Sequence, residues 1–144
     1  MLKGIDPMIG PDLLHVLARM GHGDEIVLAD ANFPAASVAR QTVEGRELRM
    51  DCDAIPALRA VLSLLPIDDF QPDPVMTMQI VGDPDGLPPV VADALPLLSA
   101  QGLRPAGIER FAFYDRAKAA FAVVRTAEAR PYGNFILRKG VIAA

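Results

Sequence analysis

Apolar segments with helical spacing alternate along this chain with short apolar runs typical of buried strands. In the first such unit, Pro11 and Asp12 suit the opening turn of a helix, and an apolar stripe predicts that this helix continues to Met20. We expect Gly21 to end the helix in the left-handed conformation. A strand over 24–30 follows after a very short link. This order of elements is typical of α/β proteins.

The same alternation continues along the rest of the sequence. The expected helices cover 51–66, 88–101 and 113–119, and the expected strands cover 75–82, 120–126 and 132–142. Pro96 should kink or split the helix that contains it, and residues 66–74 have the composition of a linker. With 144 residues and no internal repeat, the chain is expected to form one domain, 1–144. We predict an α/β fold in three layers, with a mixed, largely parallel sheet flanked by helices.

Composition argues against several classes of partner. The net charge is −4 and Lys and Arg form no run, so we expect no binding to nucleic acid. No apolar stretch approaches the ~18 residues of a membrane span, and residues 1–14 hold no uninterrupted apolar region of a secretory signal. Cys52 is the only cysteine, which excludes an internal disulfide and fits a reducing compartment. We therefore expect a cytoplasmic protein that does not bind a membrane.

Several motifs of metal and cofactor chemistry are absent from the sequence. His22, Asp24 and Asp30 could converge on a metal ion, but there is no H-x-x-x-H pair and no cysteine cluster, so we expect no metal site. The glycines at 21 and 23 follow a helix and precede a strand, which reverses the order of a dinucleotide-binding fingerprint. No serine lies in the G-x-S-x-G setting of a hydrolase nucleophile.

Polar side chains at the ends of the expected elements fit acid–base chemistry on a neutral polar substrate. These side chains are His22, Asp24, Asp30, Asn32, Arg110, Tyr114, Tyr132 and Asn134. Each has a structural explanation when taken singly; Asp30 and Asn32, for example, suit a turn before Pro34. Together they offer carboxylate and amide acceptors, one arginine and aromatic rims, which is the combination expected of a sugar pocket.

Three stretches of the sequence resemble the L-fucose mutarotase and D-ribose pyranase family, and more closely its fucose branch. They are 1–37, which contains "GHGDEIVLADANFP", 109–124, which contains "RFAFYDRA", and 132–141, which opens with "YGN". The combination is specific, whereas "GHGD" alone would not be. Asn32 and Ala36 depart from fucose-type relatives, which can carry histidines at these positions, so the identity of the sugar stays open.

The resemblance implies a role for individual residues and a form of assembly. It makes His22 the proton donor, and it implies that the sugar is contacted by Asp30, Arg110, Tyr132, Gly133 and Asn134. It also implies an α/β domain that assembles into rings, often decamers, with sites near the subunit borders. The resemblance therefore implies a homo-oligomer that binds a small monosaccharide.

A mutarotase interconverts the α and β anomers of a reducing sugar by opening and reclosing its ring. No electron moves and no group is transferred, so we expect no cofactor. Histidine has an ordinary pKa near neutrality, and we expect His22, at the negative end of the opening helix, to protonate the ring oxygen. Tyr132 is our candidate for a hydroxyl relay at the anomeric hydroxyl. Two alternatives stay open: pyranose–furanose interconversion of D-ribose, and sugar binding without turnover as an accessory of a transport system.

Overall fold

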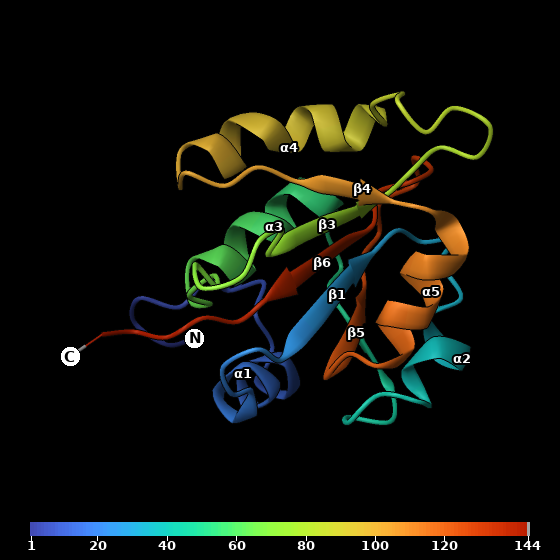
Figure 1. Cartoon of the computed structure of the whole chain (residues 1–144). Helices are drawn as coiled ribbons and strands as arrows, with labels where there is room; N and C mark the ends of the chain where they lie inside the picture. Colours follow the sequence, from blue (N-terminus) through green and yellow to red (C-terminus); the bar gives the residue numbers. More distant parts are fainter. Residues whose placement is uncertain (144) are drawn as a thin grey trace.

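The computed structural model describes residues 1–143, and within them five helices pack around a six-stranded sheet (Figure 1). The helices are α1 (Pro11–Arg19), α2 (Ala35–Ala39), α3 (Ala54–Leu62), α4 (Pro89–Ser99) and α5 (Arg110–Lys118). The strands are β1 (Glu25–Ala29), β2 (Glu47–Arg49), β3 (Val75–Met78), β4 (Ala106–Ile108), β5 (Ala122–Arg125) and β6 (Phe135–Arg138).

The strands lie in the order β2–β5–β1–β6–β3–β4. β6 is antiparallel to both of its neighbours, β1 and β3, and the other neighbouring strands are parallel. The prediction of a mixed, largely parallel sheet is therefore confirmed. Because β6 alone is reversed, its first residues lie at the same edge of the sheet as the carboxyl ends of β1 and β3. Ligands of α/β sheets bind at this kind of edge.

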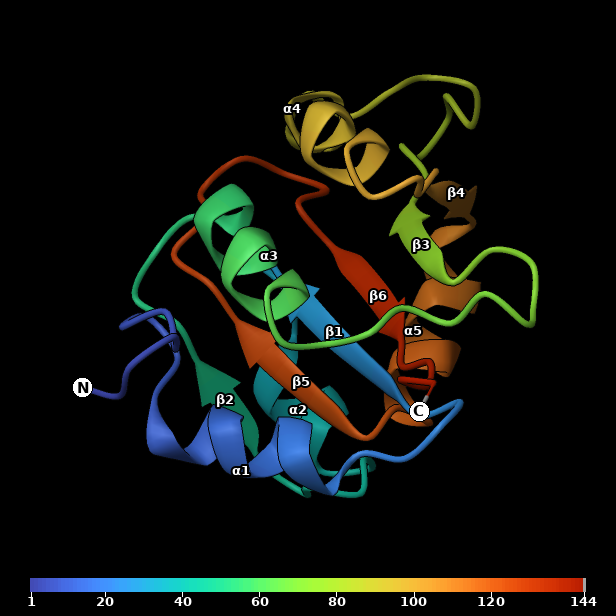
Figure 2. The same cartoon turned by 90° about the vertical axis from the view of Figure 1, so that its left-hand side faces the viewer.

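Helices cover both faces of the sheet, which confirms the three predicted layers. Side chains alternate along β1: Ile26 and Leu28 pack with residues of α1, α3 and α4, whereas Val27 and Ala29 pack with residues of α2 and α5. Figure 2 shows α1, α3 and α4 on the near side of the sheet, with α2 and α5 behind it. All four of these β1 side chains are completely buried, so β1 is the central strand of two apolar cores.

The first helix ends differently from our expectation. α1 ends at Arg19, and Gly21 does not adopt the left-handed conformation; Gly23 does, with φ of +86°. The prediction for Gly21 was wrong because the end of α1 is closed by a side chain from a distant part of the sequence. The ammonium of Lys139 donates hydrogen bonds to two carbonyl groups of this helix end.

Other elements also differ from the sequence-based expectation. α5 begins at Arg110 rather than at 113, because the carboxylate of Glu109 caps it by accepting from two backbone N–H groups. α4 continues through Pro96, which lies in its last turn, where the loss of one backbone hydrogen bond interrupts little of the helix. The short elements α2, β2 and β4 were not predicted.

Candidate functional site

A small polar pocket opens at the edge of the sheet where β1 and β3 end and β6 begins. Its volume is about 210 Å³. It is lined by Asp30, Asn32, Phe33, Met78, Arg110, Tyr114, Pro131, Tyr132 and Asn134. The structure thus brings together four of the five predicted sugar contacts, which come from segments far apart in the sequence. The fifth, Gly133, is buried next to them.

Asp30 and Asn134 form the buried floor of this pocket. The backbone N–H of Asp30 donates to Oδ1 of Asn134 at 2.9 Å, and Nδ2 of Asn134 donates to Oδ2 of Asp30 at 3.0 Å. The backbone N–H groups of Asn32 and Gly133 also donate to the Asp30 carboxylate. This pairing fixes both side chains, so the carboxylate oxygens and the amide are already in place for a ligand.

Burial raises the pKa of the Asp30 carboxyl above its ordinary value. Hydrogen bonds from the side chain of Asn134 and from nearby backbone N–H groups oppose this effect without cancelling it. A carboxylate in this position is a strong hydrogen-bond acceptor for sugar hydroxyl groups while it is ionised.

The segment between β5 and β6 holds the other polar groups against the floor. Tyr132 has a φ of +61°, in the left-handed region that tyrosine rarely adopts, and its hydroxyl oxygen accepts from the backbone N–H of Val81 at 3.2 Å. A Cβ atom on Gly133 would lie 2.9 Å from Cγ of Glu128 and 3.5 Å from Cβ of Asp30. Only glycine therefore lets this turn pack closely behind the pocket.

An ion pair anchors the same segment to the rest of the protein. The buried carboxylate of Glu128 accepts from Nε of Arg130 at 2.8 Å, and Arg130 also pairs with Asp93 on α4 at 2.6 Å. The hydrogen bond from Arg130 keeps the pKa of Glu128 below its ordinary value. The backbone carbonyl of Glu128 accepts from Ala31, next to Asp30. These contacts fix the segment that carries Tyr132 and its neighbours.

Arg110 supplies the positive charge of the pocket. It opens α5, and its guanidinium lies over the ring of Phe111, 4.7 Å from the ring centroid. Its Nε is buried, and within residues 1–143 it has no hydrogen-bond partner. A buried donor without a partner costs free energy unless a ligand or water satisfies it. Arg110 is therefore suited to donate to a bound hydroxyl group.

His22 is not in this pocket. It precedes β1, whereas Asp30 follows it, so the two residues lie at opposite edges of the sheet. The five residues of β1 span about 16 Å. One monosaccharide cannot touch both side chains of the same chain.

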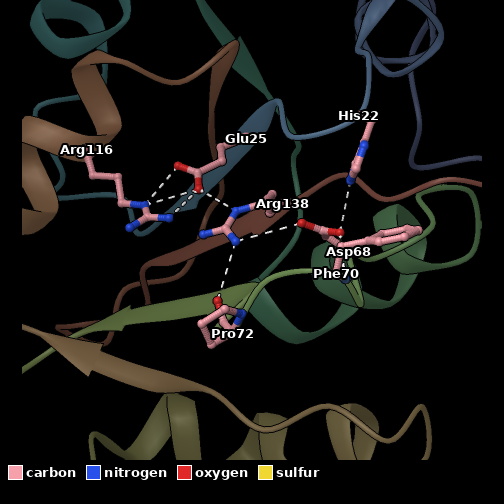
Figure 3. A network of polar contacts seen from close by, with 7 residues as sticks. All are labelled: His22, Glu25, Asp68, Phe70, Pro72, Arg116 and Arg138. Carbon is pink, nitrogen blue, oxygen red and sulfur yellow. Dashed lines mark hydrogen bonds and ion pairs between the residues drawn. The ribbon is translucent and has the colours of Figure 1, made fainter.

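His22 instead forms a pair with Asp68, at the edge opposite the pocket (Figure 3). Nε2 of the half-exposed ring, 45% accessible, lies 3.1 Å from Oδ1 of Asp68, whose side chain is only 1% accessible. The exposed ring of Phe70 packs against the imidazole, with the two centroids 5.2 Å apart. Because the carboxylate engages Nε2, the ring can exchange a proton with a ligand through Nδ1.

Asp68 was missed by the sequence analysis, which assigned residues 66–74 to a linker. The backbone N–H of Phe70 donates to its carboxylate, and this hydrogen bond is the main reason why the pKa of Asp68 lies below its ordinary value. His22 and Arg138 lower the pKa of Asp68 further, whereas burial opposes them. No local pattern marks this residue, because its partner His22 lies 46 positions away in the sequence.

The described residues contain neither a candidate metal centre nor a helix that could cross a membrane. No group of three or more His, Cys, Asp or Glu side chains in residues 1–143 is arranged to hold a metal ion. None of the helices in the same range has the length and apolar character needed to cross a bilayer.

Comparison with known proteins identifies the family. Residues 3–142 match the model of the RbsD / FucU transport protein family. The chain belongs to this family. The resemblance recognised in the sequence is thereby confirmed, and the match covers both the pocket and the His22–Asp68 pair.

Similar proteins and solved structures align with nearly the whole chain. The sequence is 51% identical to a fucose mutarotase of Homo sapiens, over 99% of this chain and 95% of that protein. The fold superposes with a TM-score of 0.88 on the crystal structure of the fucose mutarotase of Streptococcus pneumoniae in complex with L-fucose, at 38% identity, covering 99% of this chain and 100% of that one. RbsD of Bacillus subtilis, solved with D-ribose, shares the fold at 22% identity, with a TM-score of 0.71 and coverage of 99% and 100%.

Proposed function

We propose that this protein is a mutarotase that interconverts the α and β anomers of L-fucose. The observation that carries the proposal is the pocket, in which Asp30, Arg110, Tyr132 and Asn134 converge from distant segments. Its groups offer acceptors and donors for the hydroxyl groups of one small sugar. The names of the relatives support fucose rather than ribose as the sugar, since the relative solved with ribose is the more distant one.

We further propose that His22 of a second copy completes the site. An acid near neutral pH is needed at the ring oxygen, and His22 is an exposed histidine with a partner that orients it. Within one chain it lies too far from Asp30. Phe70 beside His22, and Phe111 and Val81 beside the pocket, are exposed apolar groups that suit a contact between copies. Such a head-to-tail contact generates a ring when it closes.

The proposed reaction opens and recloses the sugar ring with protons in balance. His22 donates a proton to the ring oxygen. The anomeric hydroxyl passes its proton to the hydroxyl oxygen of Tyr132, which releases its own proton to water, so the bond between the anomeric carbon and the ring oxygen breaks and an aldehyde forms. Rotation about the next carbon–carbon bond exposes the other face, and the steps reverse. Tyr132 is the proposed relay for the anomeric proton, because its hydroxyl accepts from Val81 and keeps its own hydrogen available. Asp30, Arg110 and Asn134 orient the sugar.

Nuclear magnetic resonance can follow the reaction directly. Saturation of the α-anomeric proton of L-fucose should transfer to the β signal faster in proportion to the added protein. The His22→Ala variant should lose this effect, and the His15→Ala variant, which removes the other histidine, exposed on α1, should retain it. Binding without added exchange would favour an accessory protein of transport, and faster exchange with D-ribose than with L-fucose would favour a pyranase. We place this activity in the cytoplasm, in line with the single unpaired cysteine.

A further inference from the structure

A line of alternating charges continues inward from the His22–Asp68 pair (Figure 3). Arg138, on β6, lies between Asp68 and Glu25, and Arg116 of α5 closes the line on the other side of Glu25. Arg138, Glu25 and Arg116 do not line the pocket, and none of them forms a hydrogen bond or an ion pair with His22. None of these three residues was predicted from the sequence to have a functional role.

Arg138 is held so that it faces two carboxylates. Its Nε lies 3.2 Å from Oε1 of Glu25, and its Nη1 lies 3.8 Å from Oδ2 of Asp68 and 3.4 Å from the carbonyl oxygen of Pro72. The side chains of Arg138 and Glu25 are each only 14% accessible. Oδ2 of Asp68 is buried and has no hydrogen-bond partner within residues 1–143. The guanidinium of Arg138, with which it forms an ion pair, is therefore the nearest group that compensates its negative charge.

Glu25 limits how strongly Arg138 acts on Asp68. Arg116 binds Glu25 by a bidentate ion pair, with separations of 2.6 to 3.1 Å, and this pair keeps the Glu25 carboxylate close to Arg138. The contact of Arg138 with Glu25 is shorter than its contact with Asp68. Arg138 therefore neutralises Asp68 only in part, and the remaining negative charge is available to the imidazole.

We propose that Arg138 is a positioning residue for the His22–Asp68 pair, and that Glu25 sets the strength of its effect. Arg138 keeps the Asp68 carboxylate in line with His22, and its charge moderates how firmly that carboxylate holds a proton on the imidazole. A proton donor must also take its proton back, so a fully uncompensated Asp68 would make His22 a weaker acid. The kinetic consequence of this inference rests on the proposed function, whereas the electrostatic part does not.

The other charged groups near His22 either have partners of their own or are exposed to solvent. Asp24 accepts from the backbone N–H of Gly21, and Lys139 donates to the carbonyl groups at the end of α1. Asp69, next to Asp68, is exposed, so solvent weakens its effect. A change in the titration of His22 caused by substitution of Arg138 or Glu25 can therefore be assigned to the line of charges.

The test is an NMR titration of the His22 ring in variants that remove one charge at a time. In Arg138→Gln the titration midpoint should move up by about 0.5–1 pH unit, because a positive charge near Asp68 is lost. In Glu25→Gln the midpoint should move down, because Arg138 is then free to approach Asp68. Arg138→Lys should stay near the wild type. Arg125→Gln, which removes a strand arginine paired with Glu47 at 3.4 Å, should leave the midpoint unchanged.

The titration midpoint of His22 is expected to move in opposite directions in Arg138→Gln and Glu25→Gln, and this difference distinguishes an electrostatic role from a structural one. If the variants merely loosened Asp68, both midpoints would move down together, and this result, or no movement in either variant, would overturn the inference. With L-fucose, Arg138→Gln should lower the exchange rate at saturating sugar about three- to tenfold with KM unchanged, and Arg138→Lys should recover it. If the wild type shows no anomer exchange, the proposed function fails, while the titration still decides the inference.

Discussion

His22 and Asp30 lie at the two ends of one five-residue strand, β1, on opposite edges of the sheet. A rigid central strand, buried on both faces, keeps them apart, and no side-chain movement can bring them to the same small ligand. If both act on one sugar, each sugar must lie between two copies of the chain.

Mixed assemblies provide the first test of this arrangement. His22→Ala should reduce anomer exchange by about 10²–10⁴-fold while sugar binding remains measurable. Arg110→Ala should also be inactive, because its guanidinium lines the pocket. Co-expression of the two inactive variants should restore exchange at about a quarter of the sites, since only the border between an intact His22 and an intact Arg110 is complete. If the mixture stays as inactive as its components, the two residues do not act across a border.

Asp68 provides the second prediction, which concerns the orientation of His22. Asp68→Asn should lower the exchange rate by at least about tenfold, because the imidazole loses its partner. Asp69→Asn, the exposed neighbour, is the matched control and should retain wild-type exchange.

Acid unfolding gives an independent readout of the same residue. The pKa of Asp68 is lower in the folded state, so this carboxylate stabilises the fold above its ordinary pKa, and that contribution is lost as the pH falls. Thermal unfolding between pH 7 and about pH 3 should therefore show a weaker pH dependence for Asp68→Asn than for the wild type. Equal pH dependence would contradict the role of this carboxylate in the folded state.

Local sequence patterns were sufficient to predict the α/β fold with a mixed sheet between two layers of helices. The apolar stripes of α1 and α3 and the apolar run of β1 are long enough to show their periods. The elements β2 and β4 have three residues each and α2 has five, which is too short for a period to appear. β2 and β4 are positioned by pairing with β5 and β3, and α2 is positioned by packing against β5 and α5, all of which are distant in the sequence.

In the candidate site, too, residues in recognisable turns could be predicted, whereas residues that depend on contacts between distant segments could not. The turns that carry Asp30 and Asn134 have recognisable residues, and the family resemblance points to them. Asp68 could not be found, because its role depends on the approach of residues 46 positions apart. The family resemblance implied that His22 and Asp30 act on the same sugar, but an extended strand separates its ends by about 3.3 Å per residue, so the two residues of one chain lie far apart.

Gly133 leads to the third prediction, about packing behind the pocket. In Gly133→Ala the new Cβ would lie 2.9 Å from Cγ of the buried Glu128, so the turn or the Glu128–Arg130 pair must shift. We expect a loss of about 1–3 kcal/mol in the free energy of unfolding, together with weaker binding of L-fucose. Gly10→Ala is the matched control, because no atom other than those of its two chain neighbours lies within 4 Å of its Cβ position. Urea unfolding and sugar titration of both variants provide the measurement, and similar results for the two would refute this explanation.

Tyr132 leads to the fourth prediction, which separates its chemistry from its contacts. Tyr132→Phe keeps the ring and removes the hydroxyl that accepts from Val81. If the hydroxyl relays the anomeric proton, the exchange rate at saturating L-fucose should fall about tenfold or more while KM changes little. Tyr114→Phe, which alters the other tyrosine that lines the pocket, is the matched comparison. A rise in KM alone for Tyr132→Phe would assign this hydroxyl to binding instead of proton transfer.

Asp30 leads to the last prediction, the pH dependence of sugar binding. Burial raises the pKa of this carboxyl in the folded protein, so its ionised form is lost at a higher pH than for an exposed aspartate. The ionised form accepts hydrogen bonds from sugar hydroxyl groups, and affinity for L-fucose should therefore fall as the pH drops through this raised pKa. The stability of the fold should change in the opposite sense, because a raised pKa in the folded state means that the contribution of Asp30 is largest at low pH and is lost as the pH rises.

Calorimetric titrations with L-fucose between pH 8 and pH 4 can measure the effect on binding. The affinity should fall with pH in the wild type and in Asp115→Asn, a variant of an exposed aspartate on α5, and no such step should appear in Asp30→Asn. An affinity that stays constant over this range in the wild type would exclude an ionised Asp30 as a sugar contact.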